Sequence, residues 1–244
     1  MNLQLKNLSV GYHSPIVKNI NFEIEGGQLA VLIGKNGSGK STLLKSLGGI
    51  LPVLEGEIRI DNRLIHQKEI PHYISVVLTD RPVGQLKVNE ILKLGRLPYT
   101  NTLNRLEKKD KELIEKAVSE LEIESLQERL FSQLSDGEKQ IVMIARAIVQ
   151  DTPVILLDEP TTHLDLENKA RVLKLLKNLA NKGKTVIFSS HDLNLLLPEV
   201  ENFLVIDKGV CIRGSKVEVL NRLKNLFTKG LLIFDEKEMR FKLT

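Results

Sequence analysis

The chain has 244 residues, of which 42% are hydrophobic and 27% charged, and this composition excludes a disordered, collagen-like or low-complexity chain. Its longest apolar runs, such as 29–33 and 154–157, are far shorter than the ~20 residues of a membrane-spanning helix, so we do not expect it to cross a bilayer. The net charge of +4 arises in residues 208–244, with 9 Lys and Arg against 4 Asp and Glu; this local excess, with phenylalanine as its only aromatic residue, does not indicate nucleic-acid binding.

The amino-terminal region lacks the basic start and apolar block of a secretory signal peptide, so we expect the chain to stay in the cytosol.

The same region is predicted to form antiparallel strands. Between Leu3 and Glu25 apolar residues recur with a period near two, interrupted at Gly11 and Pro15, which predicts an antiparallel strand pair. Residues 57–65 repeat the pattern.

Three continuous apolar runs predict strands of a parallel sheet that is buried on both faces: 29–33, 154–157 and 185–189. Between the first two runs, residues 108–121 place their apolar side chains on one face of a helix, and 135–149 form a second such helix. We therefore expect a helical segment over 81–150, inserted between two strands of the parallel sheet.

The most specific motif is a phosphate-binding loop directly after the first buried strand and before a helical stretch at 42–48. Glycines let the loop turn its N–H groups inward, and the helix N-terminus adds positive potential, so the loop can hold phosphate oxygens. In this motif the lysine reaches the β and γ phosphates and the serine hydroxyl faces Mg²⁺. Its residues match GxxxxGK[ST] and are Gly34, Lys35, Asn36, Gly37, Ser38, Gly39, Lys40 and Ser41, followed by Thr42.

Two adjacent carboxylates follow the buried strand 154–157. Asp158 can hold a metal, directly or through water, and Glu159 can accept a proton from an attacking water. Taken alone, acids at this position are equally explained as favourable partners of a helix N-terminus. Their combination with the phosphate loop favours nucleotide hydrolysis.

The sequence Leu134-Ser135-Asp136-Gly137-Glu138 resembles the signature motif of the ATP-binding cassette family, usually written LSGGQ or LSGGE. Ser135 followed three residues later by Glu138 is also a capping box, which starts many helices that bind no ligand. Ser135 lies 23 residues before Asp158, on the predicted helical insertion, and this is the order found in the family. The resemblance implies that Ser135 and Gly137 contact ATP bound to a second copy.

Other positions resemble the same family. Tyr12 resembles the aromatic residue that stacks on adenine, and residues 161–165 resemble the D-loop. His191 resembles the switch histidine that contacts the γ phosphate, although a lone histidine after a buried strand is more often a core residue. The resemblance extends over about 3–220.

Residues 88–99, which end in LGRLPY, resemble a segment of the ATPases that serve importers of iron siderophores, haem and cobalamin. Residues 205–214 resemble the closing strands of that group. Taken alone, 88–99 is simply a helix with a Gly-Arg end.

The sequence departs from the family at two positions. Thr79 stands where the family has a glutamine that ligates Mg²⁺ and senses the transmembrane subunit; Asp80 and Gln85 are alternative residues for that role. Asp136 replaces the first glycine of the signature. A carboxylate near a triphosphate is unfavourable unless it points away or caps the helix, so we expect hydrolysis to be slow or to need the partner subunit.

The resemblance implies a P-loop NTPase of the α/β class, with a parallel-sheet core, an antiparallel β subdomain and an inserted helical subdomain. We expect one domain over 1–244: the core and β subdomain at 1–80 and 151–215, the helical subdomain at 81–150, and a C-terminal extension at 216–244. The implied cofactors are ATP and Mg²⁺, with Ser41, Asp158 and Thr79 facing the metal and with Glu159 and His191 as catalytic residues.

The implied function is the ATP-hydrolysing subunit of an importer of iron chelates, haem or cobalamin, peripheral on the cytoplasmic face of the cell membrane. Its expected partners are a second copy in a head-to-tail dimer, permease subunits docked at 79–99 and, indirectly, a substrate-binding protein. One alternative is a soluble cassette ATPase in DNA repair, translation or iron–sulfur assembly, which explains the catalytic motifs equally well but not LGRLPY. A small-molecule kinase would not explain 134–138 or His191.

Overall fold

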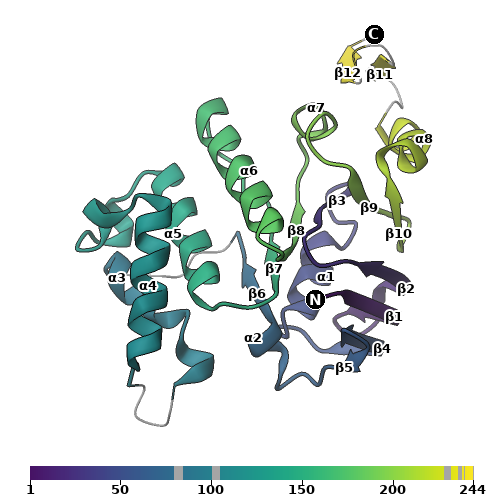
Figure 1. Cartoon of the computed structure of the whole chain (residues 1–244). Helices are drawn as coiled ribbons and strands as arrows, with labels where there is room; N and C mark the ends of the chain where they lie inside the picture. The colour runs from purple at the N-terminus through teal and green to yellow at the C-terminus, as the bar shows by residue number, and fades with distance from the viewer. Residues whose placement is uncertain (80–84, 101–104, 228–231, 236–237, 239, 244) are drawn as a thin grey trace.

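The computed structural model describes residues 1–79, 85–100, 105–227, 232–235, 238 and 240–243. Ten strands form one large sheet and two form a separate hairpin, β11 and β12 (Figure 1). The strands are β1 Leu3–Gly11, β2 Pro15–Ile24, β3 Leu29–Gly34, β4 Val53–Ile60, β5 Arg63–Leu64, β6 Ile74–Val77, β7 Val154–Leu157, β8 Thr185–Ser189, β9 Asn202–Asp207, β10 Val210–Ser215, β11 Leu232–Asp235 and β12 Arg240–Leu243.

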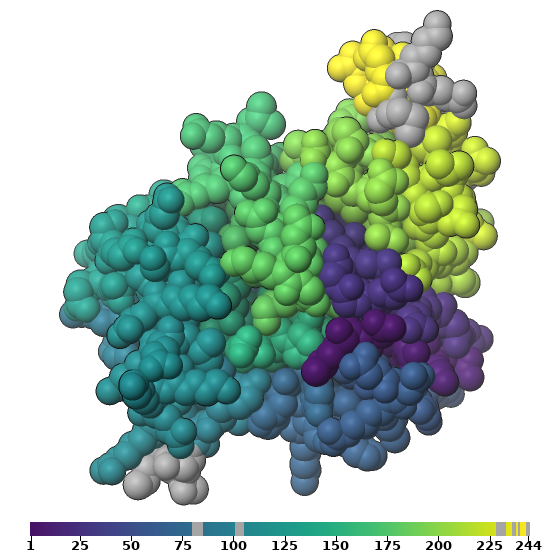
Figure 2. Space-filling model, viewed as in Figure 1, coloured from purple at the N-terminus to yellow at the C-terminus, as the bar shows by residue number. Residues whose placement is uncertain are grey.

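Helices lie on both sides of the large sheet and at one end of it. The helices are α1 Lys40–Leu47, α2 Ile70–Tyr73, α3 Val88–Leu94, α4 Lys108–Leu121, α5 Asp136–Val149, α6 Leu166–Asn181, α7 Leu193–Leu196 and α8 Lys216–Phe227, with short 3-10 helices η1 Leu97–Tyr99, η2 Glu124–Leu126 and η3 Phe131–Gln133. Figure 2 shows the teal helices α3 to α5 at one side of the molecule and the purple amino-terminal strands at the other.

The sheet order is β5-β4-β1-β2-β10-β9-β3-β8-β7-β6. Strands β9, β3, β8, β7 and β6 are parallel, whereas β1 pairs antiparallel with β2 and β4. The mixed α/β fold, with parallel strands at 29–34, 154–157 and 185–189, is therefore confirmed, as is the antiparallel pair within 3–25.

Alternation along β3 divides the core between the two faces of the sheet. Ala30 and Leu32 pack in one cluster with the apolar residues of α1, whereas Val31 and Ile33 pack in the other with those of α5 and α6. A strand that buries both faces has a continuous apolar sequence, which explains the run at 29–33.

Three predicted boundaries differ from the structure. The strand predicted at 57–65 begins at Val53, because β4 pairs with β1 from Val53 opposite Val10 to Ile60 opposite Leu3, and it ends at a turn in which Asp61 and Asn62 have positive φ. The helix predicted at 42–48 begins at Lys40, directly after the phosphate loop. The helix predicted from Ser135 begins at Asp136, with Ser135 as its cap.

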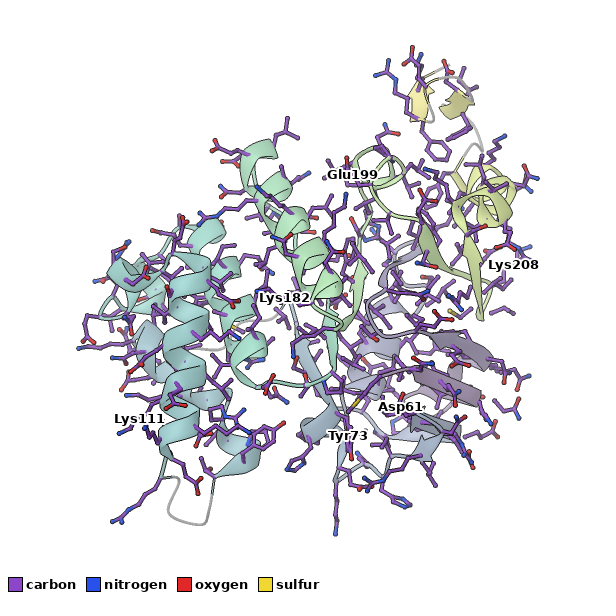
Figure 3. The ribbon with its side chains drawn as sticks, in the orientation of Figure 1. Asp61, Tyr73, Lys111, Lys182, Glu199 and Lys208 are labelled. Carbon is purple, nitrogen blue, oxygen red and sulfur yellow. The ribbon has the colours of Figure 1, made fainter. Side chains whose placement is uncertain are left out.

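The carboxyl-terminal segment packs on the same core. Helix α8 lies against β9 and β10, and the β11–β12 hairpin contacts both α8 and α7 (Figure 1). At another junction Lys182, which follows α6 and is labelled in Figure 3, pairs with Glu120 of α4 at 2.8 Å. No helix in the described ranges is long and apolar enough to span a membrane.

Candidate nucleotide-binding and hydrolysis site

The phosphate loop connects β3 to α1, at the carboxyl end of the parallel strands. Gly39 caps α1 with φ of 105°, a left-handed conformation that favours glycine. A Cβ atom at Gly39 would lie 2.6 Å from a methyl carbon of Val17, so this position also lacks space for a side chain. The fold therefore requires glycine immediately before Lys40.

The Lys40 ammonium is folded back over the loop. Its Nζ donates to the carbonyl oxygens of Gly34 at 2.9 Å and Lys35 at 3.2 Å, and the residue is only 5% exposed. Burial lowers the pKa of Lys40, while the nearby carboxylates of Glu159 and Asp158 act in the opposite direction. A buried cation in a glycine-rich loop at a helix N-terminus is suited to a polyanion.

Asp158 and Glu159 are fixed by one hydroxyl group from β8 and one from the residues that follow β6. Ser189, which ends β8 and is fully buried, donates to Asp158 Oδ1 at 2.7 Å and accepts from the Glu159 N–H at 2.8 Å. From the other side, Thr79 Oγ1 donates to the Asp158 carbonyl at 3.2 Å. These hydrogen bonds therefore fix the backbone from which the two acidic side chains project.

Glu159 faces His191. His191 Nε2 lies 2.6 Å from Glu159 Oε1, and Thr162 Oγ1 donates to Glu159 Oε2 at 3.1 Å. Glu159 has φ of 50°, unusual for a residue other than glycine, and the Ser189 contact holds this strained backbone. The His191 side chain is 38% exposed, so it is not a core histidine.

The phosphate loop and the Glu159–His191 pair line one cavity of about 750 Å³. It brings together half of the predicted site residues but not Asp158 or Thr79, and its walls are Ile16, Asn36, Gly37, Gly39, Lys40, Ser41, Thr42, Glu159 and His191. Tyr12 is 55% exposed and does not line this cavity. Neither Ser135 nor Gly137 lines it, so a single chain does not bring the signature motif to its own phosphate loop.

A second cavity, of about 490 Å³, lies on the other side of Glu159. Thr79, Asp136 and Lys139 are among its walls, together with Thr162 and His163. Asp136 is the first residue of α5 and faces Lys139 at 3.6 Å. A cation thus accompanies the carboxylate that replaces the family glycine. Asp80 lies outside the described residues, and Gln85 lines neither cavity.

The signature motif forms the capping box that its sequence predicts. Ser135 Oγ accepts from the Glu138 N–H at 3.3 Å, and the Glu138 carboxylate accepts from the Ser135 N–H at 2.8 Å. That backbone bond, opposed by partial burial and assisted by Arg129, lowers the pKa of Glu138. A Cβ atom on Gly137 would meet the Asn168 side chain at 2.9 Å, so glycine brings α5 close to α6.

The LGRLPY segment connects the ends of three helices. Arg96 Nε donates to Asp110 Oδ1 at 2.8 Å, and both side chains are buried. The same guanidinium donates to the Val149 and Gln150 carbonyls at the end of α5 and lies 4.0 Å from the ring centre of Tyr99. The arginine of this motif therefore packs the helical segment together.

Two contacts of the site were not expected from the sequence, although Thr162 lies in the segment 161–165 that resembles the D-loop. Ser189 touches both acidic residues and Thr162 touches the Glu159 carboxylate. The sequence carries a signal for Ser189. This residue ends β8, Asp158 follows β7, and the carboxyl ends of adjacent parallel strands lie together.

A phosphate loop between a buried strand and a helix, with a carboxylate–histidine pair across the cavity, defines a nucleotide-binding ATPase. Residues 17–162 match the profile of the family described as ABC transporter. The chain is 37% identical over 236 residues to an uncharacterised ABC transporter ATP-binding protein of Methanocaldococcus jannaschii, covering 92% of this chain and 81% of that protein. It belongs to the ABC transporter family, whose ATP-binding chains are ATP hydrolases coupled to transport.

Two further similarities are to proteins of transport systems. The achromobactin transport ATP-binding protein of Dickeya dadantii is 36% identical, over 88% of this chain and 83% of that protein. A chain of a transporter assigned to the metal-chelate type, solved in an inward-facing conformation, superposes with a TM-score of 0.81 at 30% identity, covering 98% of this chain and 94% of that chain. These similarities are to transport proteins and do not support the soluble alternative.

Proposed function

We propose that this chain is the ATP-hydrolysing subunit of an importer of chelated iron or a related metal complex. The observation that carries the hydrolytic part is the Glu159–His191 pair, which faces the phosphate loop across one cavity. The choice of cargo is supported by the achromobactin relative, by the metal-chelate structure and by the resemblance of 88–99.

In the proposed mechanism, the loop N–H groups and Lys40 bind the triphosphate and neutralise part of its charge. Glu159 accepts the proton of the attacking water, and its second oxygen is held by Thr162, so its carboxylate has a fixed direction. His191 orients Glu159 and contacts the γ phosphate. Tyr12 is assigned to stacking on the adenine by its resemblance to the aromatic residue of the family, and its side chain is exposed.

Mg²⁺ is the metal proposed for this site. Its donors would be the Ser41 hydroxyl and the Asp158 carboxylate, whose Oδ1 is already oriented by Ser189, with Thr79 as a further hydroxyl ligand. Hydroxyl and carboxylate oxygens are the ligands that Mg²⁺ prefers, so these residues fit the metal. When bound, Mg²⁺ neutralises charge that develops on the phosphate oxygens.

A second copy completes the site in this proposal. Ser135 and Gly137 do not line the cavity of their own chain, and a head-to-tail dimer would bring them to the ATP of the partner.

We propose that the chain is divided into three parts. The core and β subdomain comprise 1–80 and 151–215, the helical subdomain is 81–150, and the C-terminal extension is 216–244. We further propose that permease subunits dock on 79–99, that a substrate-binding protein acts through them, and that the chain lies on the cytoplasmic face of the cell membrane.

Uptake measurements in the source organism test the cargo. Cells whose only copy of this chain carries Glu159→Gln should lose uptake of radioiron-labelled siderophore but keep uptake of an unrelated nutrient such as an amino acid. Retained siderophore uptake would exclude this cargo. Purification of the wild-type chain in detergent should also recover a polytopic membrane protein; recovery with ribosomes or DNA instead would contradict the transport assignment.

A further inference from the structure

The C-terminal hairpin is anchored on the core through aromatic packing. Phe241 of β12 is 8% exposed, and its ring lies 5.0 Å from that of Phe234 in β11 and 6.1 Å from that of Phe227 at the end of α8. Helix α8 in turn packs on β9 and β10. The hairpin therefore has a fixed support on the large sheet.

The hairpin also holds α7, through one side chain. Asn194 Nδ2 donates to the carbonyl oxygen of Phe241 at 3.0 Å, and the Phe241 N–H donates to Asn194 Oδ1 at 2.7 Å. This amide satisfies both backbone groups of one strand residue, as a neighbouring strand would. The two residues are 47 positions apart in the sequence, so the contact ties the C-terminus to a distant loop.

Helix α7 begins two residues after His191. It has only four residues, and a single turn gains little stability from its own hydrogen bonds. On one side Asp192 caps it and pairs with Lys169 of α6 at 2.9 Å. On the other side Asn194 joins it to the hairpin. The backbone that carries His191 is thus held between α6 and the C-terminal extension.

We propose that Asn194 is a positioning residue. Its two hydrogen bonds to the backbone of Phe241, here called the Asn194–Phe241 clasp, fix α7 and keep His191 against Glu159. This gives the extension over 216–244 a role in ATP hydrolysis, and it rests on the proposed role of His191. Loss of the clasp leaves the phosphate loop intact, so it should affect turnover and not ATP binding.

The test is steady-state ATP hydrolysis by the full-length chain. Asn194→Ala should lower kcat roughly three- to tenfold, because small displacements of catalytic groups are costly, while KM for ATP stays within about twofold. Asn194→Asp keeps the acceptor for the Phe241 N–H and should give an intermediate rate. The matched control is Asn225→Ala, which makes the same deletion on an exposed position of α8 and should behave as wild type. An unchanged kcat for Asn194→Ala would overturn the proposal.

A second comparison separates positioning from a general structural effect. In single-turnover assays, Asn194→Ala should add no further loss in a His191→Ala background, because it acts through that side chain. Additive losses would overturn the proposal. If His191→Ala alone leaves turnover unchanged, the proposed role of His191 fails; if only Asn194→Ala is silent, the clasp alone fails. If Asn194→Ala folds poorly, Phe241→Ala replaces it in this test. Phe241→Ala loosens the hairpin from α8 and should lower kcat by the same factor that is expected for Asn194→Ala.

Discussion

His191 Nε2 lies 2.6 Å from Glu159 Oε1, and these two residues come from loops that follow neighbouring parallel strands. Each carboxylate oxygen of Glu159 has its own partner, since Thr162 occupies the other. A general base whose direction is fixed in this way does not have to be oriented at the moment of reaction.

Glu159→Gln should retain ATP binding but lose turnover. Glutamine keeps the shape and can still contact His191, but it cannot accept the proton of the attacking water. A general base contributes ~10²- to 10⁴-fold, so phosphate release should fall by about that factor. Nucleotide binding measured by fluorescence or calorimetry is the control. Phosphate release within twofold of wild type would remove Glu159 from this role.

The same variant should reveal the proposed dimer. Because each ATP would bridge the phosphate loop of one copy and the signature motif of the other, slow hydrolysis should trap the closed form. Light scattering should then show a dimer for Glu159→Gln with ATP and Mg²⁺, and a monomer without nucleotide. Ser135→Phe places a bulky side chain at the signature. When it is added to Glu159→Gln, the chain should remain monomeric with ATP and Mg²⁺. A monomer at saturating ATP and high protein concentration would count against the sandwich.

Ser189→Ala should reduce both turnover and stability. It leaves Asp158 Oδ1 and the Glu159 N–H without their hydrogen-bond partner in a buried site, which typically costs about 1–3 kcal/mol of unfolding free energy. Ser75→Ala is the matched control, because Ser75 is equally buried in β6 but its Oγ has no partner within the described part of the chain. Urea unfolding and ATPase rates measure the two effects. Equal behaviour of the two variants would show that Ser189 does not position the acids.

The regular parts of this site follow from sequence alone. A strand that is buried on both faces needs a continuous apolar run, so β3, β7 and β8 are recognisable, and the phosphate loop after β3 is fixed by Gly39 and Lys40. The resulting prediction, an α/β fold with a phosphate loop and two acids at strand ends, needs no knowledge of long-range contacts.

The remaining contacts depend on partners that sequence spacing does not reveal. Ser189 reaches Asp158 across 31 residues, and Asn194 reaches Phe241 across 47. Strand β10 pairs with β2 from the distant amino-terminal segment, which places the antiparallel strands beside the parallel ones. Neither periodicity nor capping identifies such pairs, because both describe neighbours within one element.

Arg96→Met should destabilise the chain strongly, because it leaves the Asp110 carboxylate buried without its cation. Breaking such a pair typically costs about 3–5 kcal/mol. The exposed pair Lys87–Glu128 has the same 2.8 Å separation, so Lys87→Met is the matched control and should cost far less than Arg96→Met, because solvent screens an exposed pair. Chemical unfolding at neutral pH measures both. Similar losses for the two variants would mean that burial of the Arg96 pair is unimportant.

The same pair predicts a dependence of stability on pH. Burial alone would raise the pKa of Asp110, but the hydrogen bonds from the Glu107 N–H and from Arg96 outweigh it and lower that pKa. A lowered folded-state pKa contributes stability above the unfolded value, near 4, and this contribution is lost as the pH falls through the folded value. The melting temperature of wild type should therefore fall more steeply below about pH 4 than that of Asp110→Asn. Parallel curves would contradict this origin.

Thr79→Val tests the position at which the chain departs from its family. The change deletes one hydroxyl at nearly constant volume, and in the structure that hydroxyl donates to the Asp158 carbonyl. Its oxygen still has lone pairs for a metal, and a neutral oxygen binds Mg²⁺ more weakly than a carboxylate. We therefore expect a moderate loss of hydrolysis and a shift of the ATPase curve to higher Mg²⁺, with Thr79→Ser restoring both. The measurement is ATPase rate against Mg²⁺ concentration for the three chains. Superimposable curves for wild type and Thr79→Val would remove Thr79 from the metal site and leave its bond to Asp158 as a purely structural contact.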